Sequence, residues 1–236
     1  MRKDTKNFYK KTKLKEKLEI DSNEEAPIEY VKVFHKTYPR LPSRKLKPRN
    51  YLDKFEELTS QRESIRSFSK DPMSYQQLSN ILHSCRINDY NRDPERRSYP
   101  SAGARFPIET YVTNFNVEGI EKGAYHYNIL DNTLETLLEE NLDKEKESII
   151  SALENPAAAI VLTSAIPRSE VKYGAKAYPF SLIEAGHMGQ NIILSSEREN
   201  IGTCPIGGYV NDKVSEILDL TENEIPLYVI GLGKKQ

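Results

Sequence analysis

The feature that most constrains this chain is an apolar run near its middle, Ala-Ala-Ala-Ile-Val-Leu-Thr-Ser-Ala at residues 157–165. The run has the length of a β-strand and lacks the alternation of polar residues that a strand with one face in water shows. We therefore predict a central strand buried on both faces, which requires a covering layer on each side of its sheet. With 236 residues, the chain is long enough to bury such a core.

Further strands and short helices are predicted around this run. Aromatic and β-branched residues indicate strands at 109–115 and 124–129, and the segment 225–233 resembles a last strand. Ser74 and Gln77 form a capping box at the start of a helix. Short helices are expected in three other segments: 52–61, 144–153 and 212–218. Strands and helices alternate, with hairpin-like pairs among them, which favours a mixed sheet covered by helices over a purely parallel one.

The strongest helix prediction covers residues 180–200. Its members nearest to one stripe are Leu182, Gly186, Gln190 and Ile193. Gly202 is expected to supply the helix stop.

Residues 1–50 are expected to form a basic, partly extended arm ahead of a folded domain at 51–236. The arm has about fifteen Lys and Arg against about seven Asp and Glu. Prolines at 39, 42 and 48 predict an extended course there. The arm is either a solvated segment or a binding surface for an acidic peptide or partner, and the sequence leaves both readings open.

Charge and composition exclude several classes of protein. A net charge of −1 gives no general reason to expect nucleic-acid binding. No stretch approaches the roughly 18 apolar residues of a membrane span, and no apolar run follows the basic N-terminus, so a cytoplasmic protein is expected. Cys85 and Cys204 are expected to be free thiols rather than a disulfide. The histidines lack ligand spacing, so no metal is predicted, and the late Gly-Leu-Gly is followed by no Rossmann helix.

Three short motifs carry candidate chemistry, although each has an ordinary structural explanation when it stands alone. Arg62, Ser64 and Arg66 would line one side of an extended segment and suit a phosphate monoester, or they are a solvated surface. The segment Pro-Ser-Ala-Gly-Ala at 100–104 lets a ring or backbone approach closely, or it is a turn. Gly-Gly at 207–208 exposes backbone N–H groups to a planar ligand, or it is a plain loop.

Together with the helix Glu-Ala-Gly-His-Met-Gly-Gln-Asn, these motifs resemble the nitroreductase superfamily in their order and spacing, over roughly residues 50–236. The resemblance implies an α+β fold with a mixed, mostly antiparallel sheet, a homodimer, and FMN bound at its interface. The residues it assigns to the cofactor are Arg62, Ser64, Arg66, Pro100, Ser101, Gly103, Gly207, Gly208 and Lys234. Lys235 follows Lys234 immediately, and the chain stops at Gln236, so the family's basic phosphate contact is less well matched there.

Two segments resemble one branch of that superfamily, the azoline dehydrogenases of thiazole- and oxazole-modified microcin biosynthesis. One is Pro-Ser-Ala-Gly-Ala-Arg-Phe-Pro-Ile-Glu, and the other is the stretch from Lys172 to Tyr178. In that branch an adjacent Lys and Tyr are the catalytic pair, which implies this role for Lys172 and Tyr173. The branch usually has Arg where this chain has Lys176, so any bidentate contact there would be weaker.

The implied reaction turns a thiazoline or oxazoline of a ribosomally made precursor peptide into its azole, after a cyclodehydratase partner has closed the ring. A hydride leaves for the flavin and a protein base takes the proton. A lysine beside a tyrosine can supply such a base near neutral pH. Because Gly174 follows, we expect Lys172 and Tyr173 to lie in a loop. Tyr178 and His187 are secondary candidates.

Two other functions are compatible with the sequence. One is an NAD(P)H-dependent nitro- or quinone reductase of the same fold, which would not need Lys172. The other is a non-catalytic scaffold subunit of a peptide-modification complex, with its basic arm as the docking segment.

Overall fold

A computed structural model of the chain describes residues 1–16, 35–47, 53–151 and 153–236. The helices are α1 (Lys3–Thr12), α3 (Lys54–Gln61), α4 (Tyr75–Leu82), α5 (Lys146–Ile149), α6 (Pro167–Tyr173), α7 (Ala177–Arg198) and α8 (Asn211–Ile217). Short 3-10 turns are η1 (His83–Cys85), η2 (Ala102–Ala104) and η3 (Gly174–Lys176). The strands are β1 (Met73–Ser74), β2 (Ile87–Asp89), β3 (Arg96–Arg97), β4 (Ile108–Asn114), β5 (Val117–Glu118), β6 (Gly123–Asn128), β7 (Thr133–Leu138), β8 (Ala158–Ala165), β9 (Ile201–Ile206) and β10 (Glu224–Lys234).

The main sheet has the strand order β7-β6-β4-β8-β10-β9, with every neighbouring pair antiparallel. Parallel pairing occurs in β1 with β5 and in two isolated bridges, Ser64 with Thr203 and Ser67 with Glu154. The expected mixed, mostly antiparallel sheet is therefore confirmed. In the described ranges, no helix is long and apolar enough to cross a membrane.

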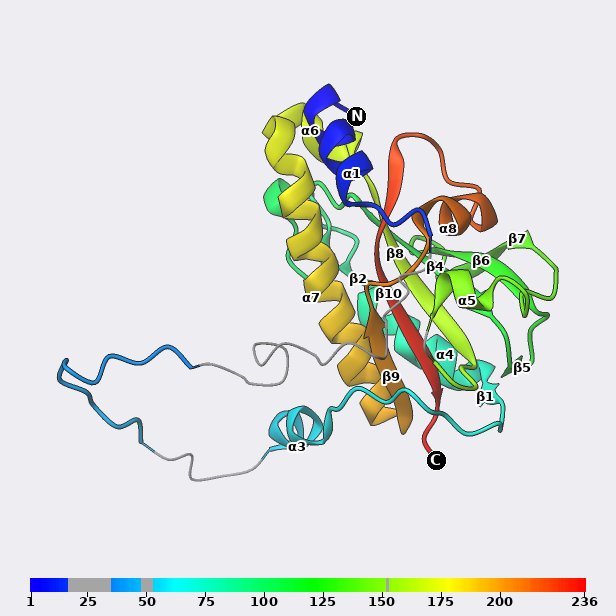
Figure 1. The fold of residues 1–236 in the computed structure, drawn as a ribbon, viewed down its shortest axis with the longest axis horizontal. Helices are drawn as coiled ribbons and strands as arrows, with labels where there is room; N and C mark the ends of the chain where they lie inside the picture. Colours follow the sequence, from blue (N-terminus) through cyan, green and yellow to red (C-terminus); the bar gives the residue numbers. More distant parts are fainter. Residues whose placement is uncertain (17–34, 48–52, 152) are drawn as a thin grey trace, which may run out of the picture.

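The central strand β8 is buried on both faces, as its apolar run predicts. Its side chains alternate between two cores: Ile160 and Leu162 pack with α4 and α7, whereas Val161 packs with α5 and α8. Figure 1 shows α7 on one side of the sheet and α5 with α8 on the other. Two helical layers thus enclose the sheet.

Local signals located several elements correctly. The capping box of α4 is present, with both the Ser74 and the Gln77 hydrogen bonds formed. The predicted helix at 144–153 is a single turn, α5, because Leu142 and Ile150 at its ends are pulled into the core beside α8. Of the arm expected at residues 1–50, the structure describes 1–16 and 35–47. Residues 3–12 form α1, and just after it the Leu14 N–H donates to Asn211 at 2.9 Å, whereas 35–47 contain no helix and are exposed. The other residues of that prediction lie outside the described residues.

The helix α7 differs from its predicted face and end. Leu182, Gly186 and Gln190 of the expected stripe are exposed, and the buried face instead contains Ser181, Glu184 and other residues. Hydropathy misplaces the face because these buried polar groups are hydrogen-bonded and replace apolar side chains there. The helix ends at Arg198 and is followed by Asn200 in the left-handed region (φ 56°), whereas Gly202 lies inside β9.

Candidate active site

The segment with alternating arginines runs extended along the outer edge of β9. Ser64 bridges to Thr203 in parallel, and the Ile65 N–H donates to the Thr203 carbonyl oxygen at 2.9 Å. Arg62, Ser64 and Arg66, which we call the arginine strip, are all exposed. Within the described chain neither arginine has an ion-pair partner, so both guanidinium groups are available to an anion.

Packing on the opposite side fixes the position of the arginine strip. Phe68 is fully buried, and Ile65 and Phe68 lie against Gly202 and Gly233, where an added Cβ would come within 3.0 Å of Ile65 and 2.7 Å of Phe68. The late Gly-Leu-Gly thus provides space for a core side chain. The charge of Arg66 acts on Cys204, whose thiol pKa is raised by burial and lowered in part by this arginine. Cys204 and Cys85 are both free and buried, as expected.

The strand β9 leads from the arginine strip to the double glycine. Thr203 lies beside Ser64, and Gly207 follows the end of β9, roughly 13 Å further along an extended chain. Gly207 is exposed, and no atom lies within 4 Å of a Cβ built there. Gly208 accepts a hydrogen bond from the Ser151 hydroxyl at 2.7 Å. On the other side of β9, Lys234 pairs with Ile201, whereas Lys235 forms an ion pair with Glu197.

The segment 100–106, which we call the PSAGA turn, has an unusual backbone. Gly103, Ala104 and Phe106 adopt φ values of 59°, 51° and 44°, in a region that L residues rarely occupy. The Ser101 hydroxyl accepts a hydrogen bond from the Phe106 N–H at 2.9 Å and donates one to Glu184 at 2.5 Å. A single serine thus joins the two ends of the turn and ties them to α7.

Lys172 and Tyr173, which we call the Lys-Tyr pair, lie against this turn. A Cβ at Gly103 would lie 2.3 Å from the Tyr173 hydroxyl and 2.8 Å from the Lys172 ammonium group, so only glycine fits beneath the two polar tips. The Lys172 ammonium lies 5.4 Å from the centre of the Tyr173 ring. The ring of Tyr173 packs edge-on against Phe180, with centroids 5.0 Å apart.

The expectation that the Lys-Tyr pair lies in a loop is wrong. Both residues belong to the last turn of α6, which ends at Gly174 with φ 56°. Successive residues of a helix point about 100° apart, rather than to opposite sides, which lets both side chains reach Gly103. Lys176 follows in η3 and is exposed.

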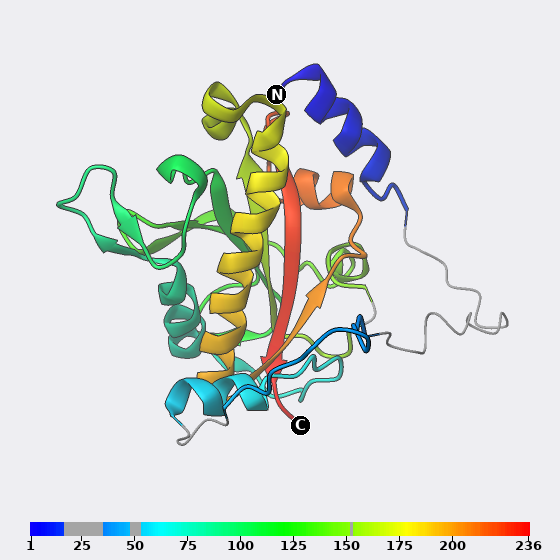
Figure 2. The same ribbon diagram turned by 90° about the vertical axis from the view of Figure 1, so that its left-hand side faces the viewer.

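The predicted residues form two groups in one chain. Figure 2 shows α6 and the green turn η2 on one side of α7, and β9 with the loop to α8 on the other side. The PSAGA turn and the Lys-Tyr pair belong to the first side, whereas the arginine strip, the double glycine and Lys234 lie around β9. The structure therefore brings the sequence-predicted residues together in two clusters rather than one.

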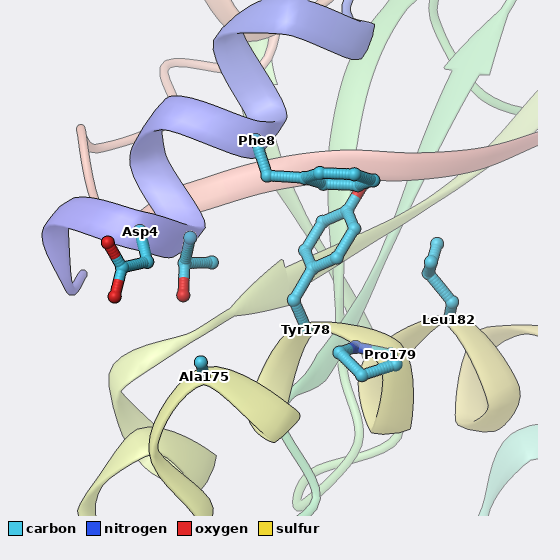
Figure 3. A pocket seen from close by; sticks show the side chains of 7 residues that line it. Asp4, Phe8, Ala175, Tyr178, Pro179 and Leu182 are labelled. Carbon is cyan, nitrogen blue, oxygen red and sulfur yellow. The ribbon is translucent and has the colours of Figure 1, made fainter.

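Of the secondary candidates, Tyr178 borders a cavity between α1 and the start of α7. The cavity holds about 480 Å³, and Figure 3 shows Phe8 and Tyr178 facing each other across it. Their rings meet edge to face at 5.5 Å. The lining is mostly apolar and contains no Lys or Arg, so the cavity offers no cation to a phosphate. His187 is exposed on α7 and borders a different cavity, next to Ser101.

Similarity to known proteins shows which family this chain belongs to. The model described as "Nitroreductase family" matches residues 59–234, about three quarters of the chain. The chain belongs to the nitroreductase family. A protein of Methanocaldococcus jannaschii, MJ1384, whose name assigns it provisionally to the nitroreductases, is 29% identical over 189 residues, which cover 77% of this chain and 91% of that protein.

Within the nitroreductase family, the chain is similar to a branch of peptide-processing proteins. The Escherichia coli microcin B17-processing protein McbC is 29% identical over 147 residues, covering 58% of this chain and 54% of McbC. A chain of the solved E. coli microcin synthetase McbBCD complex with truncated pro-MccB17 bound superposes with a TM-score of 0.79 at 21% identity, covering 100% of this chain and 95% of that one. The shared fold therefore extends beyond the matched family domain to α1.

Sequence reasoning missed Glu184, whose carboxylate contacts Ser101 of the PSAGA turn. Its side chain is 2% exposed, and burial raises the pKa of its carboxyl group to about 7, against the lowering effects of the Ser101 hydrogen bond and the Arg97 charge. A signal was available: an acidic residue between Ile183 and Ala185, inside an otherwise apolar stretch of helix, indicates a buried carboxyl group. The expected hydropathy stripe drew attention to the other face of the helix.

Proposed function

We propose that this protein is an FMN-dependent dehydrogenase that oxidises thiazoline or oxazoline rings in a ribosomally made peptide to thiazoles or oxazoles. One observation carries the proposal: Lys172 and Tyr173 converge on Gly103 of the PSAGA turn in a chain similar to a microcin-processing protein. Two proton-transfer groups at one point suit a reaction in which a ring carbon loses a proton.

The chain's own residues would handle the proton. Lys172 is exposed and sits over the ring of Tyr173, which Phe180 holds in place. Either polar tip, once deprotonated, could take the proton from a ring that reaches the two tips beside Gly103. FMN, when bound, would supply the hydride acceptor for the same ring, with oxygen as the final oxidant.

Four features of the described chain fit FMN. The arginine strip offers two unpaired guanidinium groups and a hydroxyl to a phosphate. Lys234 lies on the far side of β9 as a further cation. Gly207 leaves its backbone open to a planar ring. Ser101 and Gly103, with Pro100, would meet the ring system from the other cluster. The spacing along β9 suits a ligand with a phosphate at one end and a ring at the other.

The positions of the two clusters support a homodimer. Because α7 separates the PSAGA turn from β9 within one chain (Figure 2), we infer that a flavin on β9 of one copy meets the PSAGA turn and Lys-Tyr pair of its partner. Leu182 and Ile183, exposed on α7 at 41% and 57%, supply an apolar surface for such contact.

The proposed substrate implies partners. An azoline arises when a cysteine, serine or threonine side chain attacks the preceding backbone carbonyl with loss of water, so a cyclodehydratase must act first. A precursor peptide rich in these residues is the expected substrate. Similarity to one chain of a solved multi-protein complex with a bound pro-peptide supports an assembly of this kind.

The test combines a double variant with a cofactor readout. Replacing Lys172 and Tyr173 by alanine should abolish azole formation, followed by mass spectrometry as the loss of two hydrogens per ring, while the purified protein remains yellow. Single alanine variants of Tyr75 on α4 and Lys213 on α8, both exposed and outside the two clusters, serve as controls on the same preparation and should retain most activity. Full azole formation by the double variant would sink the assignment.

A second candidate is an NAD(P)H-dependent nitro- or quinone reductase. It is favoured by the match to MJ1384 over 91% of that protein, and by a 34% identical stretch of 67 residues in the Bacillus subtilis FMN reductase (NADPH). Mixing the flavin-loaded protein with NADPH in a stopped-flow instrument separates the two functions. Rapid bleaching of the flavin, unaffected by loss of Lys172, would favour the reductase.

A further inference from the structure

A buried carboxyl group beneath the PSAGA turn has no part in the proposed chemistry so far. Glu184 sits on α7, facing the sheet, next to the core residues Ala185 and Met188. One oxygen, Oε2, accepts the Ser101 hydroxyl proton at 2.5 Å. The other, Oε1, is buried and makes no hydrogen bond within the described part of the chain. A charged group is rarely buried with one oxygen unpartnered unless the site uses it.

The Ser101 hydroxyl links Glu184 to the backbone of the turn. Because its proton points to Glu184, its lone pairs face the Phe106 N–H, which donates at 2.9 Å. A second bond, from the Ala104 N–H to the Ser101 carbonyl oxygen at 3.2 Å, closes the turn. Ala104 and Phe106 adopt left-handed backbone conformations that nothing intrinsic to their side chains favours. The Ser101 contacts therefore oppose the turn's tendency to relax.

The PSAGA turn also contacts the Lys-Tyr pair. Both polar tips rest where a Cβ of Gly103 would be, so a shift of the Gly103 backbone would move or release them. Tyr173 is also held by Phe180, and Phe180 lines, with Ser101 and Glu184, a cavity of about 280 Å³. The carboxyl group, the turn and the ring that holds Tyr173 thus line one cavity.

We propose that Glu184 is a positioning residue: its ionised carboxylate, acting through the Ser101 hydroxyl, holds the PSAGA turn in the shape that places the Lys-Tyr pair. Protonation of Glu184 would remove the charge that strengthens its hydrogen bond from the Ser101 hydroxyl, and the turn would loosen. The inference rests on the proposed function for the role of the pair, although not for the behaviour of the turn.

Other titratable groups lie near the Glu184 carboxyl group, and one of them affects its pKa. Arg97 from β3 lowers the pKa of Glu184, but its guanidinium is also engaged by Glu95 at 2.6 Å and by the Tyr99 hydroxyl at 2.9 Å. Tyr99 is buried and its own pKa is raised by that burial. His187 lies one turn along α7 and lines the same cavity. Burial outweighs Arg97, which leaves Glu184 near half-ionised at neutral pH.

The direct test is hydrogen exchange of the Phe106 amide in the full chain, resolved to single residues by mass spectrometry at about pH 6 and about pH 8. After correction for the intrinsic rate, protection in the wild type should fall about tenfold at the lower pH, because the ionised fraction falls by about that factor. In Glu184→Gln, protection should be low and the same at both values. In Ser101→Ala it should be lost at both.

Azole formation supplies the second readout. The turnover number of the wild type should fall in the same pH range, with the KM for the peptide unchanged, and Glu184→Gln should remove that limb. If the wild type makes no azole, the proposed function fails while the exchange data still decide the role of Glu184. If azole forms but Glu184→Gln keeps the wild-type protection and its pH dependence, the positioning role alone is overturned.

Discussion

Replacing Glu184 by glutamine should stabilise this protein at alkaline pH. Burial raises the pKa of the Glu184 carboxyl group from its ordinary value of 4.5 to about 7 in the folded chain. The folded chain therefore holds a proton between these values that the unfolded chain has released, so stability falls as pH rises through this window. The full cost, present above pH 7, is about 3 kcal/mol.

Glutamine has nearly the same shape and carries no charge, so the variant avoids this cost. From about pH 5 to about pH 8, the unfolding free energy of E184Q should rise relative to the wild type by roughly 2 to 3 kcal/mol. Weaker hydrogen bonding to Ser101 adds a pH-independent offset of about 1 kcal/mol in the opposite direction. Urea unfolding of the flavin-free protein, at one protein concentration for both chains, measures the change.

Glu109 provides a matched control, because its pKa is lowered in the folded chain whereas that of Glu184 is raised. Burial would raise its pKa, but a hydrogen bond with His126 and the charge of Arg168 lower it on balance. Its charge therefore stabilises the fold above the unfolded pKa of 4.5, and E109Q should lose stability at pH 8 and less near pH 4. Parallel curves for E184Q and the wild type would refute the burial argument. A difference that keeps growing well above pH 8 would show a carboxyl group that stays protonated.

Three further outcomes test the site. G103A should lower azole formation at least about a hundredfold with flavin retained, because its methyl group displaces the Lys-Tyr pair. Its control is A104G in the same turn, which should keep activity. A104G should also gain up to about 1 kcal/mol of stability, because glycine tolerates the positive φ at that position. R66A should weaken FMN binding, measured by flavin fluorescence, roughly ten- to hundredfold without loss of folding. Mixing R66A chains with chains lacking Lys172 and Tyr173 should restore about a quarter of wild-type activity if each site spans two copies, and none if each site lies within one chain.

The sequence predicts those elements whose signals are local. The apolar run of β8 and the capping box of α4 depend on residues within one segment, and both are confirmed. The buried face of α7 could not be read in this way, because its polar members are satisfied by partners far along the chain: Ser101 for Glu184 and Ser164 for Ser181. Hydropathy counts such residues as solvent-facing.

In the candidate site, too, the features set by local sequence are predictable and those set by distant contacts are not. Alternate spacing places Arg62, Ser64 and Arg66 on one side of the chain if the segment is extended, and the described geometry is extended there. The contact of the Lys-Tyr pair with Gly103 joins segments about seventy residues apart, and no spacing rule encodes it. The family resemblance named both segments without placing one on the other. The contact depends on where α6 ends, which the tertiary fold sets.

The glycines of β9 and β10 have a consequence for changing this protein by mutation. Phe68 and Ile65 occupy the volume that a Cβ would need at Gly202 and Gly233, and these two side chains are the inner face of the segment that bears the arginine strip. A single methyl group added at Gly202 or Gly233 would therefore push on the segment proposed to bind the cofactor. Libraries that test this proposal should hold both glycines constant, because variants there would change the proposed phosphate contacts and core stability together, and selection could not separate the two effects.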